Sequence, residues 1–162
     1  MTFIEEISEY CVRVNTEVNF RLLPDSNGDW WSWRYQEGGL SVNWVNVERC
    51  GEELLVDGRE VELFFVDRQQ TESHVCGADV WSALARHKVP DQIVANVLLH
   101  HTWLIPSGWM QNSYGECQSV CFWGRSGARV LRRENMNRYN WRLREAGMNS
   151  IFDRAAPAVV FK

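Results

Sequence analysis

The first apolar positions of the chain repeat at helical intervals. A spacing of three or four residues places side chains on one face of an α-helix, and the repeating positions here are Ile4, Ile7, Cys11 and Val14. Thr2 and Glu5 are three residues apart, as in a capping box, in which each side chain satisfies a backbone N–H at the start of a helix. The pattern predicts an amphipathic N-terminal helix with its apolar stripe in the core.

The period changes to two after the turn-forming segment PDSNGD. Aromatic and polar residues alternate over 31–35, and apolar residues alternate again over 40–44, which predicts a hairpin with an aromatic face. A second predicted hairpin joins 54–56 to 60–66 across Asp57-Gly58, because this dipeptide tolerates the positive φ angles of a type I′ turn. Its inward positions would be Val61, Leu63 and Phe65, and its outward positions Glu60 and Glu62.

Helical spacing returns in the second half of the chain. Asp79 is a suitable N-cap for a short helix that contains Val80, Trp81 and Leu84, and Pro90 suits the first turn of a longer one. The apolar positions of the longer helix are Ile93, Val94, Val97, Leu98 and Leu104. We expect a strand at 119–123, a helix over 129–147 that ends at Gly147, and an edge strand at 158–161.

These elements together predict an α+β fold in a single domain covering residues 1–162. Its order is an N-terminal helix, an antiparallel β-hairpin meander, and then helices with a late strand. A chain of 162 residues is long enough to bury one core, and 45% hydrophobic with 23% charged residues is ordinary globular usage, which argues against a disordered chain.

Hydropathy and cysteine usage favour an intracellular, cytoplasmic protein that does not enter the membrane. No apolar run approaches the roughly 20 residues that cross a bilayer. The N-terminal sequence MTFIEEISEY carries acids where a secretory signal would carry cations. Five cysteines at scattered spacing are an odd number in a chain that needs no disulfides to fold, so we expect reduced thiols.

Charge is divided unevenly along the chain, although the formal net charge is only −4. Residues 1–80 hold 16 acids and 6 cations, whereas residues 81–162 hold 5 acids and 11 cations. Such asymmetry predicts electrostatic partners: a nucleic acid or an acidic protein for the basic half, and a basic partner for the acidic half. The alternative is that the two halves pack against each other and neutralise one another.

The segment RVLRRENMNRYNWRLREAG, residues 129–147, is very basic and predicted to be helical. At about 100° per residue its apolar stripe would consist of Met136, Tyr139, Leu143 and Ala146. Trp141 would project on the opposite side, with Arg138, Arg142 and Arg144 around it. An aromatic ring framed by arginines suits base stacking in nucleic acid binding and equally a hot spot of a protein interface. In a third interpretation Trp141 is buried in a second patch of core.

The candidate binding residues follow from these patterns. Trp30 is adjacent to Trp31 and would therefore lie on the other face of the strand, so it is the better candidate for exposure in the tryptophan-rich region. The outward glutamates of the second hairpin represent the acidic half. The complete set is Arg132, Arg133, Arg138, Trp141, Arg142, Arg144, Trp30, Glu60 and Glu62.

No complete catalytic or metal-binding motif is present in the sequence. His74, Cys76, Cys117 and Cys121 could supply zinc ligands, but their spacing differs from paired C-x2-C or Cys2His2 patterns. His101 falls on the apolar stripe of the long predicted helix, which is more typical of a hydrogen-bonded core histidine than of a catalyst. We therefore predict no metal and no cofactor.

Three functional hypotheses remain. The leading one is a non-enzymatic protein-binding module, an inhibitor or adaptor that acts through its charge-polarised surface, for example against a nucleic-acid-handling enzyme. The second is a nucleic-acid-binding protein that uses the Arg/Trp-rich C-terminal segment. The third is a Cys/His-dependent enzyme, since such partners can meet in space without being close in sequence. The oligomeric state is not predicted.

Overall fold

The computed structural model describes residues 4–16, 19–24, 31–36, 43–71, 74–133 and 141–162, and for 19–24 and 31–36 it describes the backbone alone. The strands are β1 (Ile4–Ser8), β2 (Cys11–Asn15), β3 (Asn19–Pro24), β4 (Trp31–Gln36), β5 (Trp44–Cys50), β6 (Glu53–Val56), β7 (Arg59–Phe64), β8 (Val75–Cys76), β9 (Ser119–Gly124), β10 (Gly127–Arg133), β11 (Trp141–Ala146), β12 (Ile151–Phe152) and β13 (Ala158–Phe161). The helices are α1 (Asp67–Thr71), α2 (Gly77–Ala83) and α3 (Ile93–His100), with 3-10 turns η1 (Leu84–Arg86), η2 (Thr102–Leu104) and η3 (Ser107–Trp109).

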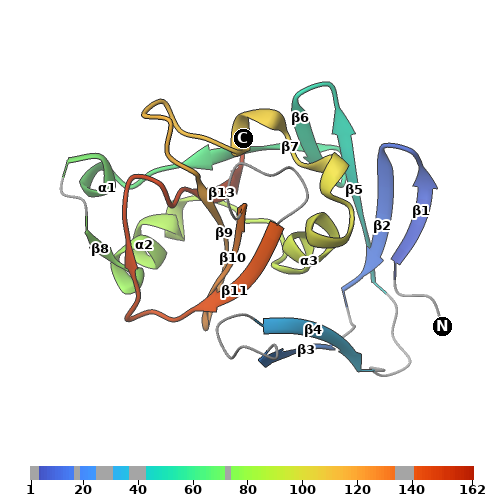
Figure 1. Ribbon diagram of the computed structural model, residues 1–162, viewed down its shortest axis with the longest axis horizontal. Helices are drawn as coiled ribbons and strands as arrows, with labels where there is room; N and C mark the ends of the chain where they lie inside the picture. Colours follow the sequence, from blue (N-terminus) through green and yellow to red (C-terminus); the bar gives the residue numbers. More distant parts are fainter. Residues whose placement is uncertain (1–3, 17–18, 25–30, 37–42, 72–73, 134–140) are drawn as a thin grey trace.

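A mixed sheet of nine strands dominates the described part of the chain (Figure 1). Its order is β1-β2-β5-β6-β7-β13-β9-β10-β11, and β12-β8 and β3-β4 form two further pairs. The protein is therefore mostly β, and the predicted α+β class is wrong. The helices that do form are few, and they come late in the chain.

The predicted N-terminal helix is replaced by the β1–β2 hairpin. Val12 and Val14 are fully buried, whereas Arg13 between them reaches Glu5 on β1. This alternation has the period of a strand, and β2 is further paired with β5 along its whole length. The helical spacing failed as a signal because the chain also places Val12 two residues before Val14, and pairing with β5 selects this alternation, which leaves Ile7 exposed.

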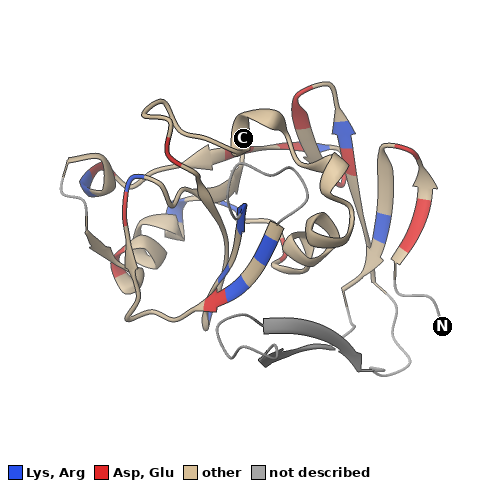
Figure 2. Cartoon of the chain, in the orientation of Figure 1, with Lys and Arg blue, Asp and Glu red and all other residues tan. Residues whose placement is uncertain are grey.

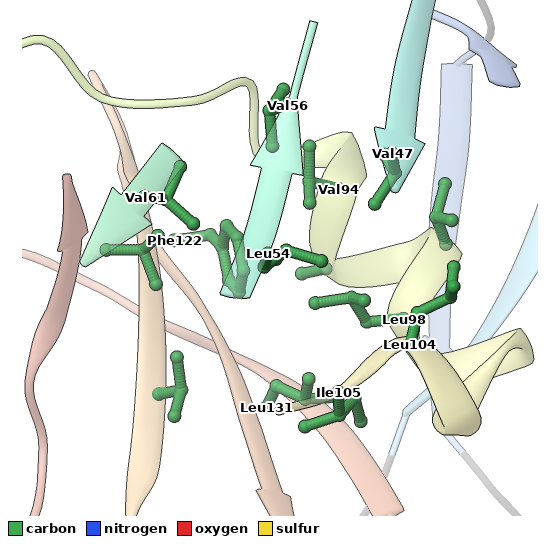
Figure 3. Packing of buried hydrophobic residues seen from close by; sticks show 14 of the residues in the cluster. Val47, Leu54, Val56, Val61, Val94, Leu98, Leu104, Ile105, Phe122 and Leu131 are labelled. Atoms are coloured by element: carbon green, nitrogen blue, oxygen red, sulfur yellow. The ribbon is translucent and has the colours of Figure 1, made fainter. Parts of the chain in front are cut away.

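Helix α3 lies in the concave side of the sheet and forms the centre of the main core. The predicted helix after Pro90 is confirmed, although it ends at His100 and Leu104 lies in η2. Contacts from α3 reach β10 and β11 on one side and β2 on the other, so the sheet curls around it. Figure 3 shows Val94 and Leu98 of α3 among side chains from β5, β6 and β7 and from β9 and β10.

A second cluster covers the opposite face of β9 and β10. The short helix predicted around Val80 is confirmed as α2, but it begins at Gly77. The Trp81 ring of α2 stacks on Trp123 of β9 with ring centroids 6.4 Å apart, and Trp123 also packs on Phe152 at 4.9 Å. Because both faces of β9 are covered, five of its six residues are buried.

The turns and strand partners correct two further expectations. The β6–β7 hairpin is confirmed, with Asp57 at φ 50° and Gly58 at φ 75° as a type I′ turn requires. The strand predicted at 31–35 exists as β4, but its partner is β3 instead of residues 40–44. Of the latter, 43 and 44 are described, and β5 begins at Trp44. The tail is a strand, but β13 lies between β7 and β9 instead of at an edge.

Candidate charged binding surface

The basic segment at residues 129–147 contains two strands of a hairpin, β10 and β11, in place of the predicted helix. Trp141 and Leu143 alternate with Arg142 and Arg144, which is strand spacing. In β10, by contrast, Val130 and Leu131 are both buried, because the sheet is covered on both faces there. The loss of alternation in β10 made the helical interpretation possible. Residues 134–140, including the candidate Arg138, lie outside the described residues, as does Trp30.

Trp141 is a core residue. It is 7% exposed and packs with Leu131 and Leu143 in the main cluster, on the sheet face that holds α3. The expectation that it projects into solvent is wrong, and the interpretation that it belongs to the core is confirmed. Its ring is therefore unavailable for stacking on a base or for a protein-interface hot spot in this structure.

Three of the candidate arginines share the other face of this hairpin. Directly opposed residues of an antiparallel pair point to the same side, and Arg132 is opposite Arg142 while Arg144 is opposite Val130. We call Arg132, Arg142 and Arg144 the arginine face. Arg132 is exposed, and the other two are half-buried. The side chains of Arg132 and Arg144 form no hydrogen bond or ion pair with any described residue.

The arginine face is a cationic side of the β10–β11 hairpin. Arg132 and Arg142 lie directly opposite each other on neighbouring strands, and Arg142 also has an interaction of its own within the protein. Figure 2 shows β10 and β11 as mostly cationic, with one acidic residue, Glu145, at the end of β11.

Arg133 and Arg129 point to the opposite face and act within the structure. Arg133 Nη1 contacts the sulfur of Met110 at 2.9 Å. Arg129 Nη1 donates to Asn96 Oδ1 of α3 at 2.8 Å. Burial lowers the pKa of Arg129, and the charges of Glu145 and Asp91 partly offset this effect. Arg133 was a candidate binding residue, but its side chain is already engaged beside the core.

The carboxylates gather at the other end of the sheet, as Figure 2 shows for β1 and β5–β7. Described residues 4–16 and 43–66 contain nine carboxylates and three cations. Several of these acids are already paired: Glu60 with Lys162, Glu5 with Arg13, and Glu52 with Arg49. Glu62 is exposed.

The two charged ends are too far apart to neutralise each other. Glu62 lies on β7, and β7 is four strand spacings from β11, or about 19 Å along the sheet at roughly 4.8 Å per strand. Charges in solvent are screened over about 8 Å at physiological ionic strength. The alternative in which the two halves neutralise one another therefore applies to Glu60, which pairs with Lys162 of the basic half, and does not describe Glu62 and the arginine face.

Three of the histidine and cysteine candidates, His101, Cys121 and Cys76, are held in buried or half-buried surroundings. His101 is 8% exposed, with Nδ1 3.2 Å from the Val97 carbonyl oxygen and Nε2 3.3 Å from Glu6 Oε1, which is the expected hydrogen-bonded core histidine. Burial raises the pKa of Cys121 to about 12, although Arg144 lowers it and Asp153 raises it further. Cys76 Sγ donates to the Met148 carbonyl.

No group of three or more His, Cys, Asp or Glu side chains is placed to hold a metal ion in the part of the chain that is described. Within the same residues, no helix has the length and apolar character needed to cross a membrane. All five cysteines are free thiols.

Sequence reasoning missed a cleft between the end of β7, α1, η3 and the loop that follows η3. It contains Tyr114, Gln118 and Arg154, and its volume is about 410 Å³. The lining residues come from several separate segments of the chain. The one available signal was the density of amide and aromatic side chains in 109–118, WMQNSYGECQ.

Comparison with protein-family models, with curated proteins and with solved structures gave no match for this chain. The geometry of the sheet and of its charged ends is therefore the basis for inferring a function.

Proposed function

We propose that this protein is a non-enzymatic binding protein, an inhibitor or adaptor, that recognises an acidic surface of a partner protein through its arginine face. The observation that carries the proposal is the pair Arg132 and Arg144, which share one sheet face and have no carboxylate partner among the described residues. Arginine suits such a surface because its planar guanidinium binds carboxylates with two parallel hydrogen bonds.

The arginine face supports this role better than the acidic end does. Glu60, Glu5 and Glu52 already contact cations of the same chain, so a basic partner would have to displace those contacts. Arg132 and Arg144 have no such contact to lose with a described residue. We therefore assign the acidic partner to the arginine face. The carboxylates at the other end of the sheet would repel an acidic partner that approaches in the wrong orientation, since complementary charge sets the orientation and rate of association.

A nucleic-acid partner is the second candidate, because the same guanidinium groups bind phosphate. It is weakened by the burial of Trp141, since single-strand binders combine cationic grooves with aromatic rings on which bases stack. An intracellular setting suits either partner and agrees with five free thiols.

The test measures binding of a fluorescein-labelled poly-L-glutamate peptide by anisotropy at several salt concentrations, with labelled oligo(dT) in a parallel series. The test variant is Arg132→Gln/Arg144→Gln. Its matched control is Arg86→Gln/Arg125→Gln, which removes the same charge from two exposed arginines outside the arginine face. Each exposed ion pair between an arginine and the peptide should contribute about 0.2–1 kcal/mol. Because the test variant loses two such pairs, we expect it to bind the peptide roughly two- to thirtyfold more weakly.

Wild type and control should bind the peptide equally, and the affinity should fall with salt. Equal weakening in both double variants would mean that net charge alone is measured, which contradicts the proposal. Oligo(dT) binding that is tighter than peptide binding and is lost in Arg132→Gln/Arg144→Gln would replace the proposal with the nucleic-acid function.

A further inference from the structure

The cleft between β7 and the loop after η3 has the size and the lining of a small-molecule site. Small-molecule pockets usually have volumes of about 300–1,000 Å³, and this one measures about 410 Å³. A neighbouring hollow of about 360 Å³ shares Gln70 and Arg154 with it. Leu63 and Phe65 form an apolar wall, and amide, hydroxyl and aromatic side chains form the remainder.

Gln118 places an unpartnered hydrogen-bond acceptor in this cleft. The residue is 3% exposed, and its backbone N–H donates to the Met110 carbonyl. Its Nε2 donates to the carbonyl oxygens of Gly108 and Gln111, at 3.2 and 3.1 Å. Both amide hydrogens are thereby used, whereas Oε1 receives no hydrogen bond from any described residue. Oε1 is not one of the fully buried side-chain atoms that lack a partner, so it is accessible from the cleft, where a ligand that donates a hydrogen bond can replace its hydration.

The charged groups at the rim cancel each other. Arg154 Nη2 donates to Glu116 Oε1 at 2.8 Å and its Nε to Glu116 Oε2 at 3.1 Å, so the pair is bidentate. Asn112 fixes this carboxylate, because its Nδ2 donates to Oε2 and its Oδ1 accepts the Glu116 N–H. An anionic or cationic ligand therefore finds no uncompensated charge from Arg154 and Glu116 in the cleft.

Tyr114 offers a flat apolar surface at the same rim. The Arg154 guanidinium covers one face of its ring, 4.0 Å from the ring centroid. The side chain is nevertheless 65% exposed, which leaves the other face to a ligand. Asn112 Oδ1 accepts the Tyr114 N–H, so the loop that carries the ring is held in place before a ligand arrives.

From these observations we infer that the cleft binds a neutral, polyhydroxylated ring, such as a sugar. A ring hydroxyl donates to Gln118 Oε1, further hydroxyls exchange hydrogen bonds with Gln70 and Ser113, and the C–H face of the ring packs on Tyr114. A hydroxyl both donates and accepts, which suits a wall that holds an acceptor and amides. This site is separate from the arginine face and does not depend on the proposed function.

Saturation-transfer difference NMR tests the inference on the full chain. The probes are methyl glucoside, methyl galactoside and N-acetylglucosamine, with glucuronate as the charged comparison and adenosine as the heteroaromatic one. The test variant is Tyr114→Ala, and Tyr10→Ala is its matched control, because Tyr10 is a similarly exposed tyrosine outside the cleft. Loss of an aromatic contact is expected to weaken sugar binding roughly two- to tenfold.

We expect at least one neutral sugar to bind wild type and Tyr10→Ala equally and Tyr114→Ala more weakly. Sugar binding that is unchanged in Arg132→Gln/Arg144→Gln would show that the cleft acts independently of the proposed function. The inference is overturned if none of the three sugars binds, if Tyr114→Ala binds as well as wild type, or if glucuronate or adenosine binds more tightly than the sugars.

Discussion

Replacing Trp141 by alanine distinguishes a core tryptophan from a surface one. Trp141 is 7% exposed between Leu131 and Leu143, beside α3. An aromatic side chain buries about 150–250 Å², which at roughly 25 cal/mol per Å² gives about 4–6 kcal/mol as an upper estimate. Measured large-to-small series give about 3–5 kcal/mol for the same change. We therefore expect Trp141→Ala to lower the free energy of unfolding by about 3–5 kcal/mol.

Urea unfolding followed by circular dichroism measures this loss directly. For a chain of 162 residues the melting temperature should fall by about 6–20 °C. Trp103→Ala is the control, because Trp103 is 46% exposed and its main polar contact is an Nε1 hydrogen bond to the Glu9 carbonyl. Trp103→Ala should lower the free energy of unfolding by no more than about 2 kcal/mol. A Trp141→Ala protein as stable as Trp103→Ala would refute the assignment of Trp141 to the core.

Three further predictions concern the turn after β9, the buried thiol and the rim of the cleft. Gly127→Ala should lower the free energy of unfolding by about 1–3 kcal/mol, because Gly127 has φ 135° and an added Cβ would lie 2.3 Å from the Ala146 carbonyl oxygen. Urea unfolding measures this change, and an unchanged unfolding midpoint would contradict the geometry. At pH 8 a thiol reagent should modify exposed Cys50 and leave Cys121 unmodified in the folded protein, because burial raises the pKa of Cys121 to about 12. Mass spectrometry of the labelled protein identifies which cysteine has reacted. Hydrogen bonds from Arg154 and Asn112 lower the pKa of Glu116 below its ordinary 4.5, so the stability that this carboxylate contributes is complete above pH 4.5 and is lost as the pH falls through the lower folded-state pKa. Glu116→Gln should remove this part of the pH dependence of unfolding, and identical pH profiles for the two proteins would contradict it.

Local signals in the sequence predicted the elements whose period is unambiguous. Asp57-Gly58 predicted its hairpin because the type I′ turn demands two positive φ angles, and few dipeptides accept them. The apolar positions after Pro90 predicted α3, because they continue over two turns and have no competing alternation. The short strand at 119–123 was also predicted correctly.

Strands covered on both faces escaped prediction. In β10 the neighbours Val130 and Leu131 are both buried, so the pattern carries no period of two. In β1 and β2 the apolar residues fit a helix as well as a hairpin, and only pairing with β5, some thirty residues away in sequence, selects the strand. The tail was predicted as a strand, but its insertion between β7 and β9 depends on contacts that no local pattern encodes.

The candidate site was predicted in part. The charge division along the chain could be read from the sequence, whereas the side on which each arginine lies could not, because it follows from the strand register. Assigning the segment to a helix placed Arg142 and Arg144 around an exposed Trp141, and the register instead puts them on the face opposite Trp141. The cleft around Gln118 was not predicted, since its lining is brought together only by the folded chain.

The order of strands explains why a division of charge in the sequence becomes a division of charge in space. From β1 to β7 the sheet contains the acidic part of the chain, and from β9 to β11 it contains the basic part. The strand inserted between them, β13, has the fully buried residues Ala158, Val159 and Val160. An apolar strand at this position adds about 4.8 Å to the separation and contributes no charge of its own along that stretch. The C-terminal strand therefore widens the separation between the two charged parts, and the same strand joins them into one sheet.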